Sequence, residues 1–288
     1  MGPIVAKQQL LKLTNLGLKG LSTDPQPWEL PAEYLTYGNN FRVFAGALNA
    51  HGGYQKWAES PANFYPGHIM HVGFLTGRYW AVMGRNAVYA FDGQNWFDIS
   101  STEGYAGLGQ NDELLWTSCM LGNIPIINNP QAYPEYWSIQ NPAVNLTRLN
   151  FDQTRDWQDL GYTFKIIRSH RNILLALNLF EGANEEPDAF RWSHPADINS
   201  IPVTWDETDD AFLAGKASLG GETGKIIDGK SLRNSFVIYS ENGINILDFS
   251  NDEFIWNRRK LSATVGLLAK DSLIEVKGKH FFMADGDI

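Results

Sequence analysis

A short unit recurs along most of this chain: a polar turn opens an apolar run, and a second apolar or aromatic run follows it. The unit is clearest at 170–178 and 232–240, where an Arg-Asn pair forms the turn. Related turns begin at residues 77, 122, 171, 233 and 278, so they lie 45, 49, 62 and 45 residues apart. Four-stranded propeller blades repeat at about 40–50 residues. The recurrence therefore predicts a repeat protein.

Further strand candidates lie before each turn and behind the second run, which completes a four-stranded unit. The chain is therefore expected to be all-β, a β-propeller of about four-stranded blades, with four complete blades and a partial fifth. The blades are expected at about 67–100, 113–150, 162–206, 211–262 and 270–288, the last being partial. Val203–Asp206 is the expected fourth strand of the third blade. The chain stops inside the fifth unit, so we expect the propeller to be completed otherwise or the sequence to belong to a longer polypeptide.

Residues 1–66 lack this unit, and Gly and Pro residues interrupt any long element there. Disordered segments are poor in aromatic residues, whereas this stretch is rich in them. We therefore expect an N-terminal arm that packs on its own body or on a neighbouring subunit. The candidate contact residues are Trp28, Tyr34, Tyr37, Phe41, Arg42, Tyr54 and Trp57.

The charge balance and the single cysteine exclude some classes of protein. The formal net charge of −9 argues against a protein that grips phosphates through clustered Lys and Arg. Cys119 is the only cysteine, so no intramolecular disulfide forms, and its apolar surroundings predict a buried, inert thiol. No apolar run reaches 18 residues, and no transmembrane helix is expected.

One segment, Gly224–Ser231, satisfies the phosphate-loop pattern GxxxxGK[ST]. Phosphate binding by this pattern requires a helix after the loop, whose N-terminus faces the phosphates. Here the next residues, 235–239, have the composition of a strand, and Ile226 and Ile227 favour extended backbone. The segment is therefore expected to be a blade hairpin rather than a nucleotide site.

No HExxH, GxSxG or CxxC motif occurs, and no catalytic, cofactor-binding or metal-binding residue is assigned. Two acidic clusters stand out, one in an apparent polar insertion at 181–188 and one at 206–210. The cluster at 206–210 is expected to be solvated rather than a metal site, and the insertion at 181–188 is expected to be a loop of the kind that often carries recognition. Their members are Glu181, Glu185, Glu186, Asp188, Asp206, Glu207, Asp209 and Asp210. A carboxylate pair of the glycosidase type stays open, since no pair is marked out.

Three groups of segments carry a resemblance to a known family. The first is an opening with Gly17, Gly20 and Pro31, followed by an Asn-x-x-Arg segment at 39–42 and Gly52-Gly53-Tyr54. The second is the turn at 170–172, followed by Phe-Arg-Trp-Ser-His-Pro at 190–195. The third is the hairpin sequence at 236–247, together with the related 281–287. Together they resemble the tail nozzle or tail hub proteins of short-tailed bacteriophages, the group that includes tail tubular protein B.

The resemblance implies a non-enzymatic virion protein of the tail, made in the host cytoplasm and needing no cofactor. It implies a homo-oligomeric ring, a hexamer, below the portal and adaptor, which contacts the tail adaptor and the tail fibre or needle proteins. Such a ring retains packaged double-stranded DNA without reading its sequence and forms the channel for its ejection. An acidic lumen would repel phosphate and let DNA slide, and the two acidic clusters are candidates for lining it.

Two other functions stay open. A carbohydrate- or protein-binding propeller would be a monomer with a pocket that exposes tryptophan. A propeller hydrolase would need convergent carboxylates about 5–9 Å apart in a central cleft.

Overall fold

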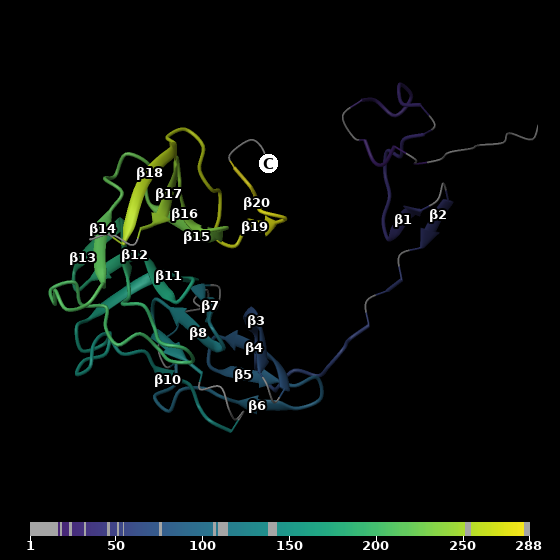
Figure 1. Ribbon diagram of the computed structural model, residues 1–288. Coiled ribbons are helices and arrows are strands. Elements are labelled where there is room, and N and C mark those ends of the chain that lie inside the picture. The colour runs from purple at the N-terminus through teal and green to yellow at the C-terminus, as the bar shows by residue number, and fades with distance from the viewer. Residues whose placement is uncertain are drawn as a thin grey trace, which may run out of the picture. The chain divides into compact units, whose positions relative to one another are not determined.

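The computed structural model describes residues 17, 19–22, 25–31, 33–44, 47–50, 52–53, 55–74, 77–105, 108, 115–137, 143–250 and 255–284. The chain divides into two compact units, Met1–Glu59 and Ser60–Ile288. The first contains one antiparallel hairpin, β1 (Phe41–Phe44) with β2 (Ala47–Ala50), in which Phe41 is opposite Ala50. The second contains five antiparallel sheets, shown in Figure 1. The expected all-β class is confirmed, since the described residues contain no α-helix.

The five sheets, numbered here in chain order, follow the repeat found in the sequence. Sheet 1 holds β3 (Pro66–Phe74), β4 (Gly77–Gly84), β5 (Val88–Phe91) and β6 (Trp96–Asp98). Sheet 2 holds β7 (Thr117–Leu121), β8 (Ile124–Asn129), β9 (Tyr133–Tyr136) and β10 (Thr147–Arg148). Sheet 3 holds β11 (Tyr162–His170), β12 (Ile173–Glu181), β13 (Asn184–Trp192) and β14 (Gly215–Ser218). Sheet 4 holds β15 (Ile226–Leu232), β16 (Ser235–Ser240), β17 (Ile244–Phe249) and β18 (Trp256–Ser262). Sheet 5 holds β19 (Leu273–Val276) and β20 (Lys279–Phe282).

The recurring turns join the first and second strands of successive sheets. Gly122, Arg171 and Arg233 begin these turns with φ of 57°, 55° and 55°, and each turn is two residues long. A positive φ at the first central residue is the geometry of a type II′ hairpin turn, which matches the right-handed twist of paired strands. The phosphate-loop pattern falls on this hairpin in sheet 4. A strand rather than a helix follows Ser231, so the interpretation as a hairpin is confirmed.

Two expectations about sheet 3 were wrong. Val203–Asp206 is not a strand, and the fourth strand is β14, which we had expected to belong to the next blade. The reason is Trp205, whose fully buried indole draws the segment between β13 and β14 into the core. The residues 181–188 are not a loop insertion either, because Glu181 pairs with Asn184 across a short turn and Glu186 pairs with Leu179.

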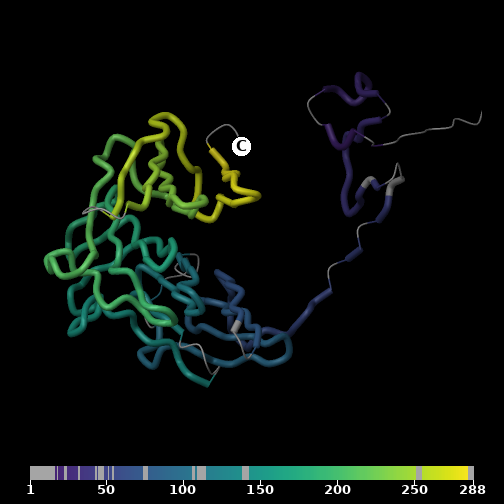
Figure 2. The backbone as a smooth tube through the Cα atoms, in the orientation of Figure 1, coloured from purple at the N-terminus to yellow at the C-terminus, as the bar shows by residue number. Residues whose placement is uncertain are grey.

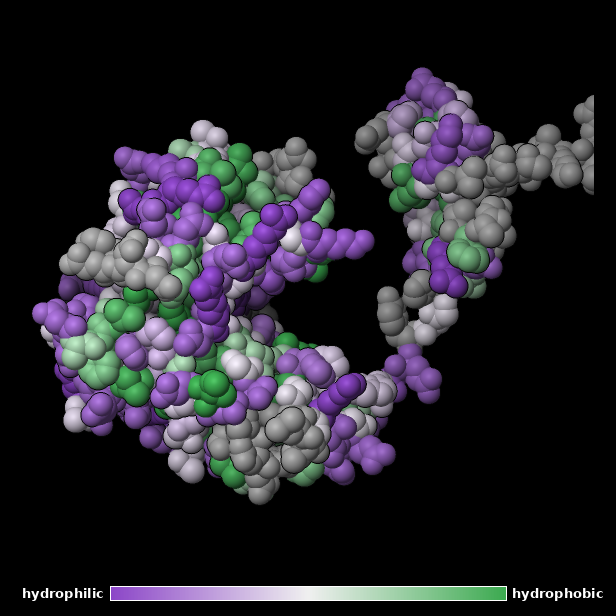
Figure 3. All heavy atoms as spheres, viewed as in Figure 1, coloured by the Kyte–Doolittle hydropathy of each residue, from purple (hydrophilic) through white to green (hydrophobic). Residues whose placement is uncertain are grey.

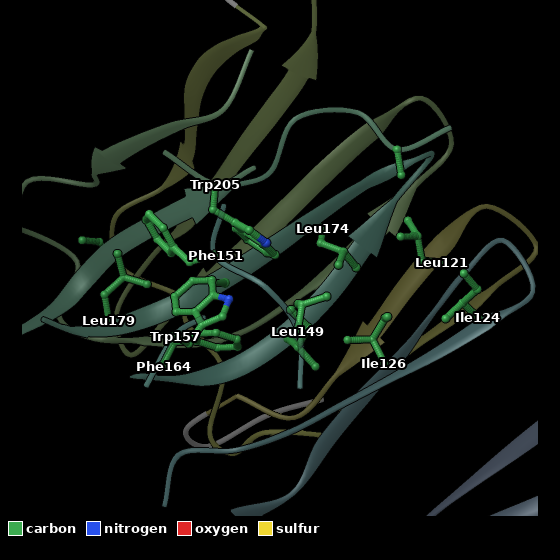
Figure 4. Packing of buried hydrophobic residues seen from close by; sticks show 14 residues of the cluster. Leu121, Ile124, Ile126, Leu149, Phe151, Trp157, Phe164, Leu174, Leu179 and Trp205 are labelled. Atoms are coloured by element: carbon green, nitrogen blue, oxygen red, sulfur yellow. The ribbon is translucent and has the colours of Figure 1, made fainter. Parts of the chain in front are cut away.

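Consecutive sheets pack face to face through four hydrophobic clusters. Sheets 1 and 2 share a cluster that includes Val72 and Trp116, and sheets 2 and 3 share one that includes Ile126 and Leu174. Figure 4 shows this second cluster, in which Trp157 and Trp205 lie edge to face at 5.1 Å. Sheets 3 and 4 share a cluster with Leu175, and sheets 4 and 5 share one with Val237. The backbone of this unit can be followed from hairpin to hairpin in Figure 2.

The first strands of neighbouring sheets also lie next to one another. β11 contacts β7, β15 contacts β11, and β19 contacts β15. A side chain on a first strand can therefore reach the sheet before it and the sheet after it. Among the described residues, none belongs to a helix with the length and apolar character that crossing a bilayer requires.

Candidate functional site

A chain of polar contacts links all five sheets where their first strands meet. It runs from His68 on β3 through Ser118 on β7 to Arg168 on β11, then to Asp228 on β15 and Asp271 just before β19. We call these five residues the inner-strand network. Sheets 1 to 4 contribute one residue each and the segment before sheet 5 contributes the fifth, so the network depends on the repeat rather than on any single sheet.

The centre of the network is a buried ion pair with complete hydrogen bonding. The Nε and Nη2 of Arg168 donate to the two carboxylate oxygens of Asp228 at 2.8 and 2.9 Å, and the side chains are 14% and 3% exposed. The amides of Gly229 and Asp271 also donate to the Asp228 carboxylate, at 2.7 and 3.0 Å. Burial alone would lower the pKa of Arg168, but the adjacent Asp228 carboxylate outweighs this effect, so the pKa is raised. Such a bidentate pair fixes geometry as well as contributing energy.

The other end of the network is neutral. His68 Nε2 lies 2.9 Å from Ser118 Oγ, and burial lowers the pKa of its imidazole.

Lys270, next to Asp271, donates from Nζ to the carbonyl of Trp116 at 2.8 Å, and burial lowers its pKa as well. The segment that carries Lys270 and Asp271 therefore connects sheets 2, 3 and 4.

A second set of hydrogen bonds repeats from sheet to sheet. The Ser169 hydroxyl donates to the Met120 carbonyl at 2.7 Å, and the Ser231 hydroxyl lies 3.2 Å from the Ser169 carbonyl. His280 Nε2 continues the series to the Ser231 carbonyl at 3.0 Å. Each of the three interfaces from sheet 2 to sheet 5 thus includes a contact from a side chain of the later sheet to a backbone carbonyl of the sheet before it.

The Ser–His contact between β11 and β15 lacks the arrangement of a nucleophilic triad. His170 Nδ1 lies 2.9 Å from Ser231 Oγ, but its Nε2 faces the Asn234 carbonyl at 3.1 Å, where a triad has a carboxylate. Burial raises the pKa of the Cys119 thiol to about 12, so this group is a poor nucleophile. Cys119 is half-buried rather than buried as expected, and its raised pKa is consistent with the predicted inert thiol. No cluster of three metal-binding side chains occurs among the residues that the structure describes.

The acidic residues predicted from sequence lie on the second and third strands of sheet 3 and in the segment after them, not on the first strands. Four of the eight are paired with cations. Arg191, 2% exposed, binds Glu181 at 2.7 Å and also Glu207, and Lys216 binds Glu181 and Glu186, each at 2.7 Å. Asp188 accepts from Ser218 at 2.7 Å, and Asp206 pairs with Arg155 at 3.1 Å. Glu185, Asp209 and Asp210 are exposed, and a role of the clusters in a channel stays a prediction.

The arm residues lie in the first unit, where several present large aromatic surfaces. Trp28, Tyr37 and Trp57 are 79%, 82% and 70% exposed. Tyr34 and Phe41 are half-buried, and Arg42 is exposed with its guanidinium 5.8 Å from the Phe44 ring. Tyr54 lies outside the described residues. The expected subunit contact of this arm stays a prediction.

Sheet 2 contains a buried carboxyl that sequence inspection did not single out. Glu135 on β9 is 2% exposed and accepts a hydrogen bond from the Tyr105 hydroxyl at 2.8 Å. Burial raises the pKa of Glu135 to about 7. The folded state holds the proton more tightly than the unfolded chain does. The contribution of Glu135 to the free energy of unfolding is therefore full below the ordinary pKa of 4.5 and is lost as pH rises through about 7.

Replacing Glu135 with glutamine is expected to remove this pH dependence, since a neutral amide still accepts from Tyr105. Denaturant unfolding at about pH 6 and about pH 8 should show the wild type losing about 1.4 kcal/mol that the variant keeps. The exposed Glu222→Gln variant is the control and should follow the wild type. Equal slopes for wild type and Glu135→Gln would contradict the prediction.

Two cavities adjoin the inner strands. The first, about 730 Å³, is lined by members of the network together with Lys230, Arg233 and Glu275. The second, about 570 Å³, lies where sheets 2, 3 and 4 meet the segment 268–270. Figure 3 shows polar and apolar side chains intermixed on the viewed face of this unit. The sequence contains a signal for the network: Arg168 and Asp228 each directly follow a pair of isoleucines in a first strand.

Comparison with known proteins shows no family for this chain. No protein-family model matches the chain, and no curated protein matches it. Among solved structures, the computationally designed Ika8 protein aligns over 86% of this chain and 95% of its own, with 11% identity and a TM-score of 0.29. A likeness at that TM-score supports no conclusion about this chain.

Proposed function

We propose that the chain is an architectural virion protein, a tail nozzle or tail hub whose sheets form a β-propeller. In this proposal it assembles as a hexameric ring below the portal and adaptor, retains packaged DNA and forms the channel for its ejection. The resemblance described above suggests this role. The feature of the structure that best supports it is the repeated inter-sheet interface, which is left open at both ends of the series.

The open ends can be identified by comparing equivalent positions. The fourth residue of β4 is Trp80, which is 40% exposed, whereas the fourth residues of β8, β12 and β16 are at most 1% exposed. The third residue of β20 is Phe281, which is 50% exposed, whereas its counterparts in the same three strands are at most 2% exposed. Large apolar side chains in such positions mark surfaces that are covered in a completed assembly.

The interior of the unit supports a structural role rather than a chemical one. Arg168 and Asp228 satisfy each other, and the Ser231–His170 contact has no carboxylate partner. The excess of acidic over basic residues, 32 against 23, suits a channel past which DNA slides.

The native mass of the purified chain, measured by light scattering with electron microscopy of the particles, tests the proposal. We expect closed rings with an axial opening. Trp80→Glu and Phe281→Glu should each lower the assembled fraction at least about tenfold, because a carboxylate buried in an apolar interface costs several kcal/mol. Ile198→Glu, at a loop position that is 94% exposed, is the control. A monodisperse monomer with carbohydrate affinity would refute the ring and favour the binding propeller.

A further inference from the structure

The second cavity has a lining that is unusual for so acidic a chain. Its charged lining residues are Lys165 on β11, Lys225 just before β15, and Lys270, and no carboxylate of the described residues lines it. Two aromatic residues, Tyr133 and Phe180, contribute to the same wall. A volume of about 570 Å³ falls in the range that small-molecule sites occupy, about 300–1,000 Å³.

The three lysines differ in how strongly they are already engaged. Lys225 pairs with Glu241 at 2.8 Å, and both side chains are substantially exposed. Lys165 holds its Nζ 5.1 Å from the centre of the Phe180 ring, and Lys270 donates to the Trp116 carbonyl with Asp271 3.7 Å away. A phosphate entering the cavity would therefore meet the Lys165 ammonium beside the Phe180 ring and the Lys270 ammonium, whose contact with the Asp271 carboxylate is long. Lysine binds phosphate as a point charge.

A buried acceptor without a donor lies in the same lining. Asn178 is 1% exposed, and its Nδ2 donates to the Ile226 carbonyl at 2.9 Å. Its Oδ1 is buried and has no hydrogen-bond partner, which is costly unless a ligand supplies a donor. Asn178 and Tyr133 also adopt left-handed backbone, with φ of 62° and 66°. For a bulky residue such as tyrosine this conformation is strained, and strain of this kind gathers at ligand sites.

We infer that this cavity binds a small organic phosphate with a planar ring and an N–H donor, the chemistry of a mononucleotide. Lys165 and Lys270 hold the phosphate, the aromatic wall contacts the ring, and Asn178 Oδ1 accepts from the N–H group. Of the phosphate-loop pattern, Lys225, Ile226 and Ile227 line this cavity, whereas Lys230 and Ser231 line the other one. The inference does not depend on the proposed virion role.

Calorimetric titration of the full chain with adenosine monophosphate, inorganic phosphate and adenosine tests the assignment. We expect a Kd below about 1 mM for the nucleotide and at least tenfold weaker binding of each part alone. Lys165→Ala and Lys270→Ala should each weaken nucleotide binding about tenfold, whereas Lys279→Ala, on the exposed face of β20, should not. Equal affinity for inorganic phosphate and the nucleotide, or no binding of the nucleotide at millimolar concentration, would overturn the assignment.

The chain also offers a matched control for Asn178. Asn128 on β8 makes the same bond to the next sheet, from Nδ2 to the Phe164 carbonyl at 2.9 Å, and its Oδ1 is likewise without a partner. Asn128 is not among the residues that line the cavity. Asn178→Ala and Asn128→Ala should therefore lower the thermal midpoint similarly, but only Asn178→Ala should weaken nucleotide binding, by about tenfold. An equal loss of affinity in both variants would show that the effect is structural and would refute the site.

Discussion

Replacing Asp228 with asparagine is expected to lower the free energy of unfolding by about 3–5 kcal/mol. Asp228 is 3% exposed on its side chain and receives both donors of the Arg168 fork. The amide of asparagine can keep the shape but not the charge, so Arg168 would be left buried with only the exposed Asp271 carboxylate nearby. An uncompensated buried charge is the main source of such losses.

A double-mutant cycle separates the loss of the pair from the loss of either residue. Arg168→Met should cost a similar amount, because it leaves the Asp228 carboxylate buried without its cation. The combined Arg168→Met, Asp228→Leu variant should recover most of the loss, since apolar replacements of a buried pair are often neutral or stabilising. Denaturant unfolding of the four chains measures the coupling.

An exposed pair in sheet 4 provides the control. Arg259 and Asp248 are also joined at 2.8 Å, but their side chains are 58% and 40% exposed. Asp248→Asn should cost less than about 1 kcal/mol, as solvent screens such pairs. If Asp228→Asn lowered the free energy of unfolding no more than Asp248→Asn does, the buried ion pair would not stabilise the contact between sheets 3 and 4.

Much of the fold could be predicted because the local periodicity of the sequence determines its hairpins. The first residues of the turn at 171–172 and of its counterpart at 233–234 both have a φ of 55°, so the sequence repeat corresponds to a repeat in space. Hairpin pairing is local, and alternating apolar runs define it. The fourth strand of the third sheet was predicted wrongly, because β14 follows a long segment that is anchored by Trp205. Nothing in the local sequence marks the point where the chain rejoins the sheet.

The candidate sites were harder to predict because they depend on which strands become neighbours. Arg168 and Asp228 are sixty residues apart and meet only because the first strands of sheets 3 and 4 are adjacent. The acidic cluster at 181–188 looked like a free loop because the cations that neutralise it, Arg191 and Lys216, lie elsewhere in the sequence. Charge patterns along a chain do not reveal such cross-strand partners.

The segment that places Lys270 and Asp271 beside the inner-strand network depends on one glycine, Gly266. Gly266→Ala is expected to lower the free energy of unfolding by about 3 kcal/mol. A Cβ at residue 266 would lie 2.1 Å from the Glu241 carbonyl oxygen and 2.3 Å from that of Ser240, and backbone atoms cannot move aside cheaply. The next residue, Leu267, is 2% exposed and its amide donates to the Ser240 carbonyl at 3.0 Å. The added methyl group must therefore lift the segment off sheet 4.

Gly73→Ala on β3 is the matched control, because the nearest atom to its added Cβ is His71 Cε1 at 4.0 Å. That variant should be neutral or slightly stabilising, since alanine restricts the unfolded chain more than glycine does. Thermal and denaturant unfolding of both variants measures the difference. Because lifting the segment also withdraws Lys270 from the cavity and Asp271 from Arg168, Gly266→Ala should weaken nucleotide binding as well as stability. A stable Gly266→Ala chain with unchanged affinity would mean that the segment does not dock on sheet 4 as described.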